Sequence, residues 1–134
     1  MTTARVLIVD DDQVALDALE QMLQLKLPNV QVETCVSALE ALERVSRERF
    51  DAVLADVAMP GMDGLQLLAC LRKPRPHMPT LLMTGHGDRE LAQRAVREGA
   101  YAYFEKPLDR EYLVHALSRA IERRPAPRRP KRNA

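Results

Sequence analysis

VLIVDDD, residues 6–12, joins four branched apolar residues to three consecutive aspartates. A continuous apolar run of this length is typical of a strand that is buried on both faces of a parallel sheet. The arrangement recurs along the chain, because apolar runs at 52–55 and 81–83 also end at polar residues, Asp56 and Thr84. The pattern predicts a parallel sheet with chemically capable side chains at the ends of its strands.

Helical patterns separate these apolar runs. Leucines at three- and four-residue spacing follow the first and third runs, and Ser37 and Asp109 are placed to cap helices. The predicted strands are 6–9, 30–35, 52–55, 80–83 and 101–104, and the predicted helices are 15–27, 37–45, 65–71, 88–98 and 109–121. Strands that alternate with helices indicate an α/β fold, a doubly wound five-stranded parallel sheet with helices on both faces. Ligands of such sheets bind beyond the carboxyl ends of the strands.

The composition fits one domain with an aliphatic core. The 134 residues are 46% hydrophobic, yet the aromatic residues are only three tyrosines and two phenylalanines. Two cysteines cannot form the disulfide framework of a secreted protein, and the first residues lack an apolar export segment, so we expect a cytoplasmic protein. No apolar run approaches the ~20 residues that cross a bilayer, which excludes an integral membrane protein.

Charge is unevenly distributed along the chain. All 19 acidic residues lie within 1–122, whereas 123–134 hold six of the 20 basic residues together with three prolines. We expect a folded domain at 1–122 and an extended basic tail, or a truncated linker, at 123–134. The tail is interpreted as a solvated end, a linker toward an output domain, or an electrostatic contact with nucleic acid or an acidic partner. Specific nucleic-acid recognition is the least favoured reading.

Four strand ends carry groups capable of phosphate chemistry. Neighbouring carboxylates such as Asp10, Asp11 and Asp56 repel one another unless a cation joins them, and Mg²⁺ prefers oxygen ligands. A carboxylate beside such an ion can act as a nucleophile toward phosphorus. The ammonium group of Lys106 and the hydroxyl of Thr84 can stabilise the charge of a phosphoryl group. These residues predict an aspartyl-phosphate site.

Four ordered motifs resemble the receiver domain of two-component response regulators. They are Val9-Asp10-Asp11, residues 55–64 (ADVAMPGMDG), Met83-Thr84-Gly85 and residues 104–107 (FEKP), within a similarity that covers about residues 4–122. The resemblance implies the flavodoxin-like strand order 2-1-3-4-5. It also implies a signalling domain rather than an enzyme, one that catalyses only its own phosphorylation and dephosphorylation.

The resemblance assigns the phosphoacceptor and the metal ligands. Asp56 matches the residue that accepts the phosphoryl group, and Asp10 and Asp11 match the acidic pair that holds Mg²⁺, or Mn²⁺ in its place. Of this pair, Asp11 is the favoured direct ligand. Asp56 and the backbone carbonyl of Ala58 complete the expected ligands from the protein. No other cofactor is expected.

Switch residues follow from the same resemblance. Thr84 and Lys106 match the residues that contact the phosphoryl oxygens, and Tyr103 matches the aromatic switch position. Phosphorylation is expected to draw Thr84 and Lys106 toward the phosphoryl group, to move the loop after the fourth strand and to turn Tyr103 inward. Asp12 has no role in the family and is interpreted as local charge or a helix cap.

The implied partners are proteins. A sensor histidine kinase or a phosphotransfer protein would donate the phosphoryl group, and an output domain or protein partner would bind the face formed by the fourth helix, fifth strand and fifth helix. Phosphorylation could also produce a homodimer. Nucleic acid is reached only indirectly, and no membrane contact is expected.

Three alternatives remain at this stage. Residues 83–88 (MTGHGD) resemble the version common in receivers fused to transcriptional activators, which favours a regulatory domain from a DNA-binding transcriptional regulator. A metal-dependent phosphatase acting through Asp56 would need a substrate pocket, of which the sequence carries no signal. A flavin or nucleotide binder is disfavoured, because three aspartates rather than a glycine-rich loop follow the first strand.

Overall fold

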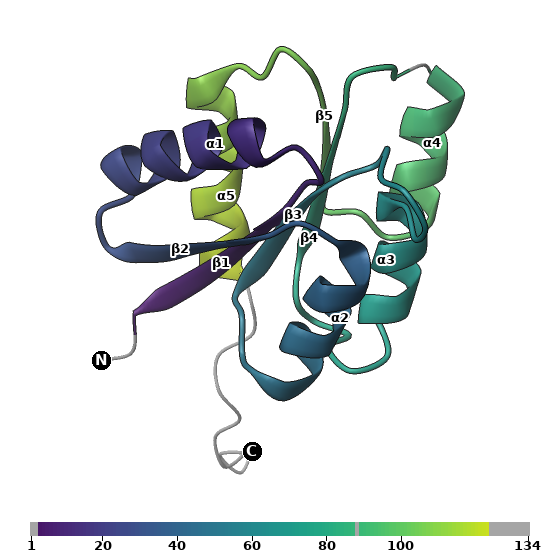
Figure 1. The fold of residues 1–134 in the computed structure, drawn as a ribbon, viewed down its shortest axis with the longest axis horizontal. Coiled ribbons are helices and arrows are strands. Elements are labelled where there is room, and N and C mark those ends of the chain that lie inside the picture. Colours follow the sequence, from purple (N-terminus) through teal and green to yellow (C-terminus); the bar gives the residue numbers. More distant parts are fainter. Residues whose placement is uncertain (1–2, 88, 124–134) are drawn as a thin grey trace, which may run out of the picture.

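The computed structural model, which describes residues 3–87 and 89–123, contains one five-stranded sheet (Figure 1). All neighbouring strands are parallel, in the order β2-β1-β3-β4-β5. The strands are β1 (Ala4–Val9), β2 (Val30–Cys35), β3 (Ala52–Asp56), β4 (Thr80–Thr84) and β5 (Ala102–Glu105). The predicted doubly wound sheet and its strand order are confirmed.

Five helices connect and cover the strands. They are α1 (Gln13–Lys26), α2 (Ala38–Arg47), α3 (Gly64–Leu71), α4 (Arg89–Arg97) and α5 (Arg110–Arg123). Figure 1 shows α1 and α5 on one face of the sheet and α2, α3 and α4 on the other. Helices α1 to α4 lie in crossover connections between parallel strands, and such connections pack a helix back onto the sheet.

Side-chain caps explain where several helices begin. The carboxylate of Asp12 accepts hydrogen bonds from the backbone amides of Val14 and Ala15, so the expectation of a helix cap at Asp12 is confirmed. Ser37 caps α2 and Asp109 caps α5, each by accepting a hydrogen bond from the amide three residues ahead. Such caps satisfy backbone donors that the first turn of a helix leaves free. The predicted cap of α4, Asp88, lies outside the described residues.

The core forms two aliphatic layers, one on each face of the sheet. Val6 and Ile8 of β1 point into the layer beneath α1 and α5, whereas Leu7 and Val9 point into the layer beneath α2 and α3. All four residues are completely buried, as expected for a strand at the centre of a parallel sheet. The predicted aliphatic core is therefore present on both sides, and it fixes the strand ends that carry the polar residues.

The predicted tail lies almost entirely outside the described residues. Helix α5 includes Arg123, and residues 124–134 are not described. Within 3–87 and 89–123, no helix combines the length and apolar character that a membrane crossing requires.

Candidate functional site

The sheet register brings the predicted site residues to one edge. Val9 pairs with Ala55, so Asp10 and Asp56 leave neighbouring strands at the same level. Thr84 pairs with Glu105, which places Lys106 directly beyond the end of the next strand. Because the carboxyl ends of parallel strands lie at one edge of the sheet, residues distant in sequence become neighbours there.

Lys106 joins the two buried aspartates. Its Nζ atom lies 2.8 Å from Oδ2 of Asp56 and 3.4 Å from Oδ2 of Asp10. Asp10 is completely buried and Asp56 is 5% exposed, whereas the Lys106 side chain is 33% exposed. The site thus holds two buried carboxylates against one cation that still reaches solvent.

Burial controls the charge of Asp10. Removal from water raises the pKa of this carboxyl above its ordinary value; the hydrogen bond from the Asp12 amide lowers the pKa, the Asp56 charge raises it, and Lys106 lowers it. A carboxylate without full compensation for lost hydration favours its neutral form. An additional cation beside Asp10 would therefore be stabilising.

Lys106 remains charged in this setting. Partial burial lowers the pKa of its ammonium group, but the hydrogen bond to Asp56 and the attraction of both carboxylates outweigh that effect, and the pKa is raised above its ordinary value. A lysine held in this way presents a fixed positive charge at the site at neutral pH.

The loop after β3 is folded tightly around Asp56. The amide of Ala58 donates to Oδ1 of Asp56 at 3.0 Å, and the amide of Gly64 donates to the carbonyl of Val57 at 2.9 Å. A Cβ atom at Gly64 would lie 2.5 Å from the backbone oxygen of Asp56. In the sequence, Gly64 is the last residue of the motif 55–64 and directly precedes a predicted helix, and this position is the available signal for close backbone approach.

Thr84 and Tyr103 lie in the adjacent strands β4 and β5. Thr84 is 2% exposed, and its hydroxyl oxygen accepts a hydrogen bond from the His86 amide at 3.2 Å. Tyr103 is half-buried against the core layer beneath α2 and α3, and its hydroxyl oxygen is shielded from solvent. Asp11, in contrast, is exposed at the start of the loop after β1.

The donor atoms suit a hard divalent cation. Asp10 and Asp56 supply convergent carboxylate oxygens, and Mg²⁺ in proteins commonly uses one or two carboxylates while keeping several waters. Within the described part of the chain, no group of three His, Cys, Asp or Glu side chains is arranged to hold a metal. The structure therefore brings together Asp10 and Asp56 of the expected ligands, and leaves Asp11 at the surface.

Comparison with known proteins decides the family. Residues 6–118 match the pattern of the response regulator receiver domain. The chain belongs to this family. The resemblance stated from the sequence motifs is confirmed, and the receiver fold accounts for the strand order and for the polar edge.

Several relatives of this receiver are named as transcriptional regulators. The C4-dicarboxylate transport transcriptional regulatory protein DctD of Rhizobium meliloti is 39% identical over 119 residues, which cover 89% of this chain and 25% of DctD. The chain spans about a quarter of the length of the curated relatives it matches.

Solved receiver structures have the same fold. A CheY-like receiver domain protein from Methanospirillum hungatei superimposes with a TM-score of 0.84 at 32% identity, covering 92% of this chain and 97% of that one. The beryllofluoride-activated NtrC4 receiver domain dimer gives a TM-score of 0.83 at 28% identity, covering 90% of this chain and 98% of that one.

Proposed function

We propose that this receiver accepts a phosphoryl group on Asp56 from the phosphohistidine of a sensor kinase or phosphotransfer protein. The observation that carries the proposal is that Asp10 and Asp56 converge on Lys106 at the sheet edge, with a carboxylate oxygen of each within 3.4 Å of the Lys106 Nζ atom. Transfer between phosphohistidine and carboxylate needs positioning and charge neutralisation more than it needs a strong base. Both are available at this site.

The transfer step uses the Asp56 carboxylate as the nucleophile. One of its oxygens attacks phosphorus, so that a P–O bond forms while the P–N bond to the donor imidazole breaks and the imidazole leaves with the electron pair. Lys106 now binds Oδ2 of Asp56 and would exchange that contact for a phosphoryl oxygen. Thr84 would turn its hydroxyl from the His86 amide toward a second phosphoryl oxygen. Hydrolysis of the P–O bond between Asp56 and the phosphoryl group would return the unphosphorylated domain and release inorganic phosphate.

Asp10, Asp11, Asp56 and the backbone carbonyl of Ala58 are the residues that would hold Mg²⁺, with Mn²⁺ as a substitute. When bound, the ion supplies positive charge that neutralises the phosphoryl oxygens. The burial that raises the pKa of Asp10 supports this assignment, because a cation relieves the cost of keeping that carboxylate ionised.

A groove beside the site offers a place for the donor protein. It has a volume of about 560 Å³ and runs between α1 and the start of α5, with Asp10 and Lys106 at one end. Apolar side chains, including Leu19, Met22 and Leu108, line the rest. Because Lys106, which lines the groove, also binds the proposed phosphoacceptor Asp56, we assign the groove to the protein that carries the phosphohistidine.

The face formed by α4, β5 and α5 is the proposed surface for output partners. Phosphorylation would bias Tyr103 and the loop after β4, and so change what this face binds. An output domain, a separate protein or a second phosphorylated copy are the proposed partners. The dimer named for activated NtrC4 and the transcriptional role named for DctD favour a receiver that regulates a DNA-binding protein.

Intact-mass spectrometry of the full chain with acetyl phosphate tests the proposal. We expect one phosphoryl adduct per chain that requires Mg²⁺ and is lost in Asp56→Asn. Asp12→Asn is the matched control, because asparagine can keep the helix cap while removing a nearby exposed charge. Failure of the wild-type chain to form the adduct, or its persistence in Asp56→Asn, would overturn the proposal. Continuous turnover of the donor without an adduct would instead favour a phosphatase.

A further inference from the structure

The loop after β4 passes against the tip of the Tyr103 side chain at Gly87. A Cβ atom at Gly87 would overlap the hydroxyl oxygen of Tyr103, and would lie 2.7 Å from Oε2 of Glu105 and 2.9 Å from Cγ2 of Thr84. Unbonded carbon atoms normally keep about 3.5–4.0 Å from their neighbours. Tyr103 can therefore occupy its observed place only because residue 87 has no side chain.

The crowded side chains come from the ends of two adjacent strands. Thr84 pairs with Glu105, and Tyr103 lies two residues before Glu105 on the same face of β5. On this face Tyr103 packs against the core layer, with its hydroxyl oxygen out of contact with solvent. The ring therefore already lies inward without a phosphoryl group, whereas the family resemblance predicted that phosphorylation would turn it inward. The chain at Gly87 lies across its tip.

We propose that Gly87 is a positioning residue that admits the Tyr103 ring to its inward place. A methyl group at position 87 would hold the ring outward. The effect of residue 87 on signalling rests on the proposed phosphorylation of Asp56, whereas its effect on the position of the Tyr103 ring does not.

The conflict at Gly87 can be relieved without unfolding. Each of the three atoms near the added Cβ belongs to a side chain, so rotation of Tyr103, together with smaller shifts of Glu105 and Thr84, makes room. The backbone at Gly87 is also outside the left-handed region, since only Gly61 and Gly99 have positive φ among the described residues, and alanine can adopt it. Gly64 differs, because there the added carbon would meet backbone atoms.

The position of Gly87 couples two parts of the proposed switch. The Thr84 hydroxyl is tied to the same loop by the hydrogen bond from the His86 amide. If Thr84 turns toward a phosphoryl group, that hydrogen bond breaks and residues 85–87 are free to shift. The space that Tyr103 uses would then depend on the state of Asp56.

Fluorine NMR of the full chain labelled with 3-fluorotyrosine tests the proposal. The chain has three tyrosines, and the Tyr103 signal is assigned by its loss in Tyr103→Phe. The readout is the shift of each signal between H₂O and D₂O, which grows with exposure of the ring. Tyr112, which is 61% exposed, is the internal reference for an exposed ring.

Gly85→Ala is the matched control for Gly87→Ala. Gly85 lies in the same loop, but a Cβ atom there would have nothing within 4 Å. We expect the solvent shift of Tyr103 to be small in the wild type and in Gly85→Ala, and to rise to the level of Tyr112 in Gly87→Ala. Circular dichroism should show the same secondary structure in all three proteins.

The same samples are then measured after treatment with acetyl phosphate and Mg²⁺. We expect Gly87→Ala to gain the phosphoryl adduct while its Tyr103 signal stays at the exposed value. An unchanged Tyr103 signal in Gly87→Ala, or an equal change in Gly85→Ala, would overturn the inference. If the wild type gains no adduct, the proposed function fails, but the comparison of unphosphorylated proteins still decides the role of Gly87.

Discussion

Asp10 combines complete burial with a negative charge, and Lys106 compensates that charge only partly at 3.4 Å. Because the folded-state pKa of Asp10 is raised above its unfolded value of 3.8, the folded chain favours the protonated carboxyl. The corresponding stability is fully present below pH 3.8 and is lost as the pH rises through the folded-state pKa. At neutral pH the buried charge of Asp10 therefore lowers the free energy of unfolding of the chain.

Asp10→Asn should stabilise the chain at neutral pH in the absence of Mg²⁺. Asparagine has the same shape and can still accept the hydrogen bond from the Asp12 amide, but it carries no charge. We expect the free energy of unfolding to rise by about 1 kcal/mol, the usual size of a point-mutation effect. Urea unfolding at pH 7.5 and at pH 3.5 measures this, and the gain should disappear at the lower pH.

Magnesium supplies the control for that variant. The wild type should gain stability from Mg²⁺, and Asp10→Asn should gain less, because one of the proposed ligands is gone. Lower stability of Asp10→Asn than of the wild type at pH 7.5, without Mg²⁺, would contradict the role given to burial.

The site residues differ in how far the sequence could predict them. Asp10, Asp56, Thr84 and Lys106 each follow an apolar run, so their meeting at one edge follows once the strands are taken as parallel. Gly87 could not be recognised in the same way, because its importance depends on how the loop after β4 packs against β5. Local patterns predict strand ends, but not the contacts of loops.

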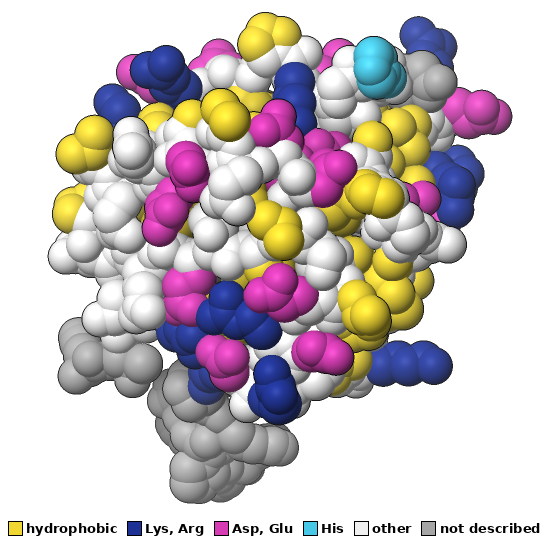
Figure 2. Space-filling view, viewed as in Figure 1, with side chains coloured by type: hydrophobic (Ala, Val, Ile, Leu, Met, Phe, Trp, Pro, Cys, Tyr) yellow, Lys and Arg dark blue, Asp and Glu magenta, His cyan; other side chains and the backbone are white. Residues whose placement is uncertain are grey.

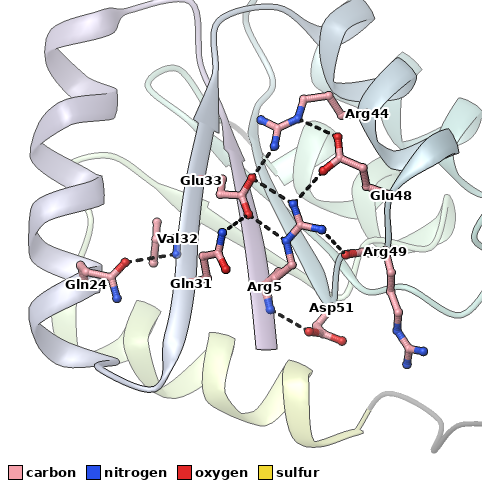
Figure 3. Close-up of polar contacts among 9 residues, drawn as sticks. All are labelled: Arg5, Gln24, Gln31, Val32, Glu33, Arg44, Glu48, Arg49 and Asp51. Atoms are coloured by element: carbon pink, nitrogen blue, oxygen red, sulfur yellow. Dashed lines mark hydrogen bonds and ion pairs between the residues drawn. The ribbon is translucent and has the colours of Figure 1, made fainter. Parts of the chain in front are cut away.

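At the scale of secondary-structure elements, an ionic cluster joins β1, β2 and α2 at the opposite end of β1 from Asp10 (Figure 3). Arg5 binds Glu33 at 2.8 Å and Glu48 at 2.7 Å, and Arg44 binds the same two carboxylates. The guanidinium of Arg5 also lies 4.3 Å from the centre of the Phe50 ring. Figure 2 shows basic side chains bordered by acidic ones on this face. The cluster fixes the amino end of β1, while the receiver site uses its carboxyl end.

Glu33→Gln should weaken this cluster. The hydrogen bond from Arg5 lowers the pKa of Glu33, burial raises it, and the hydrogen bond from Arg44 lowers it, with a net decrease from the ordinary 4.5. The stability this gives is present above pH 4.5 and is lost as the pH falls through the lowered value. Because Glu33 is partly exposed, we expect a loss of only about 1 kcal/mol at pH 7.

Urea unfolding across pH 2 to 7 measures the effect of Glu33→Gln. The curves of stability against pH for the variant and the wild type should converge at the acid end. Glu43→Gln is the control, because Glu43 is exposed on the same helix. Equal losses in both variants at pH 7 would contradict the assignment to the cluster.

Sequence patterns predict contacts between residues close in sequence, such as helix caps, but not the long-range ion pairs of the cluster. The caps at Ser37 and Asp109 could be predicted, because the side chain and its backbone partner are three residues apart. Arg5 and Glu48, which are 43 residues apart, gave no local signal. Such contacts depend on how α2 packs on the sheet.

At the scale of the whole molecule, two different surfaces are assigned to the two proposed partners. The groove beside α1, which is lined by Asp10 and Lys106, is assigned to the phosphoryl donor, whereas the α4, β5 and α5 face is assigned to the output. Both meet at the carboxyl edge, where Lys106 follows β5 and Asp10 precedes α1. The division into a domain at 1–122 and a tail at 123–134 stays a prediction, because residues 124–134 lie outside the described part of the chain.

The most direct test of the central claim is to locate the phosphoryl bond within the full chain. Phosphorylated protein is reduced with borohydride, which converts an aspartyl phosphate to homoserine, and its peptides are sequenced by mass spectrometry. The proposed function predicts homoserine at position 56, formed only when Mg²⁺ was present during phosphorylation. Homoserine at position 10 or 11 instead, or at no position despite an adduct on the intact chain, would contradict it.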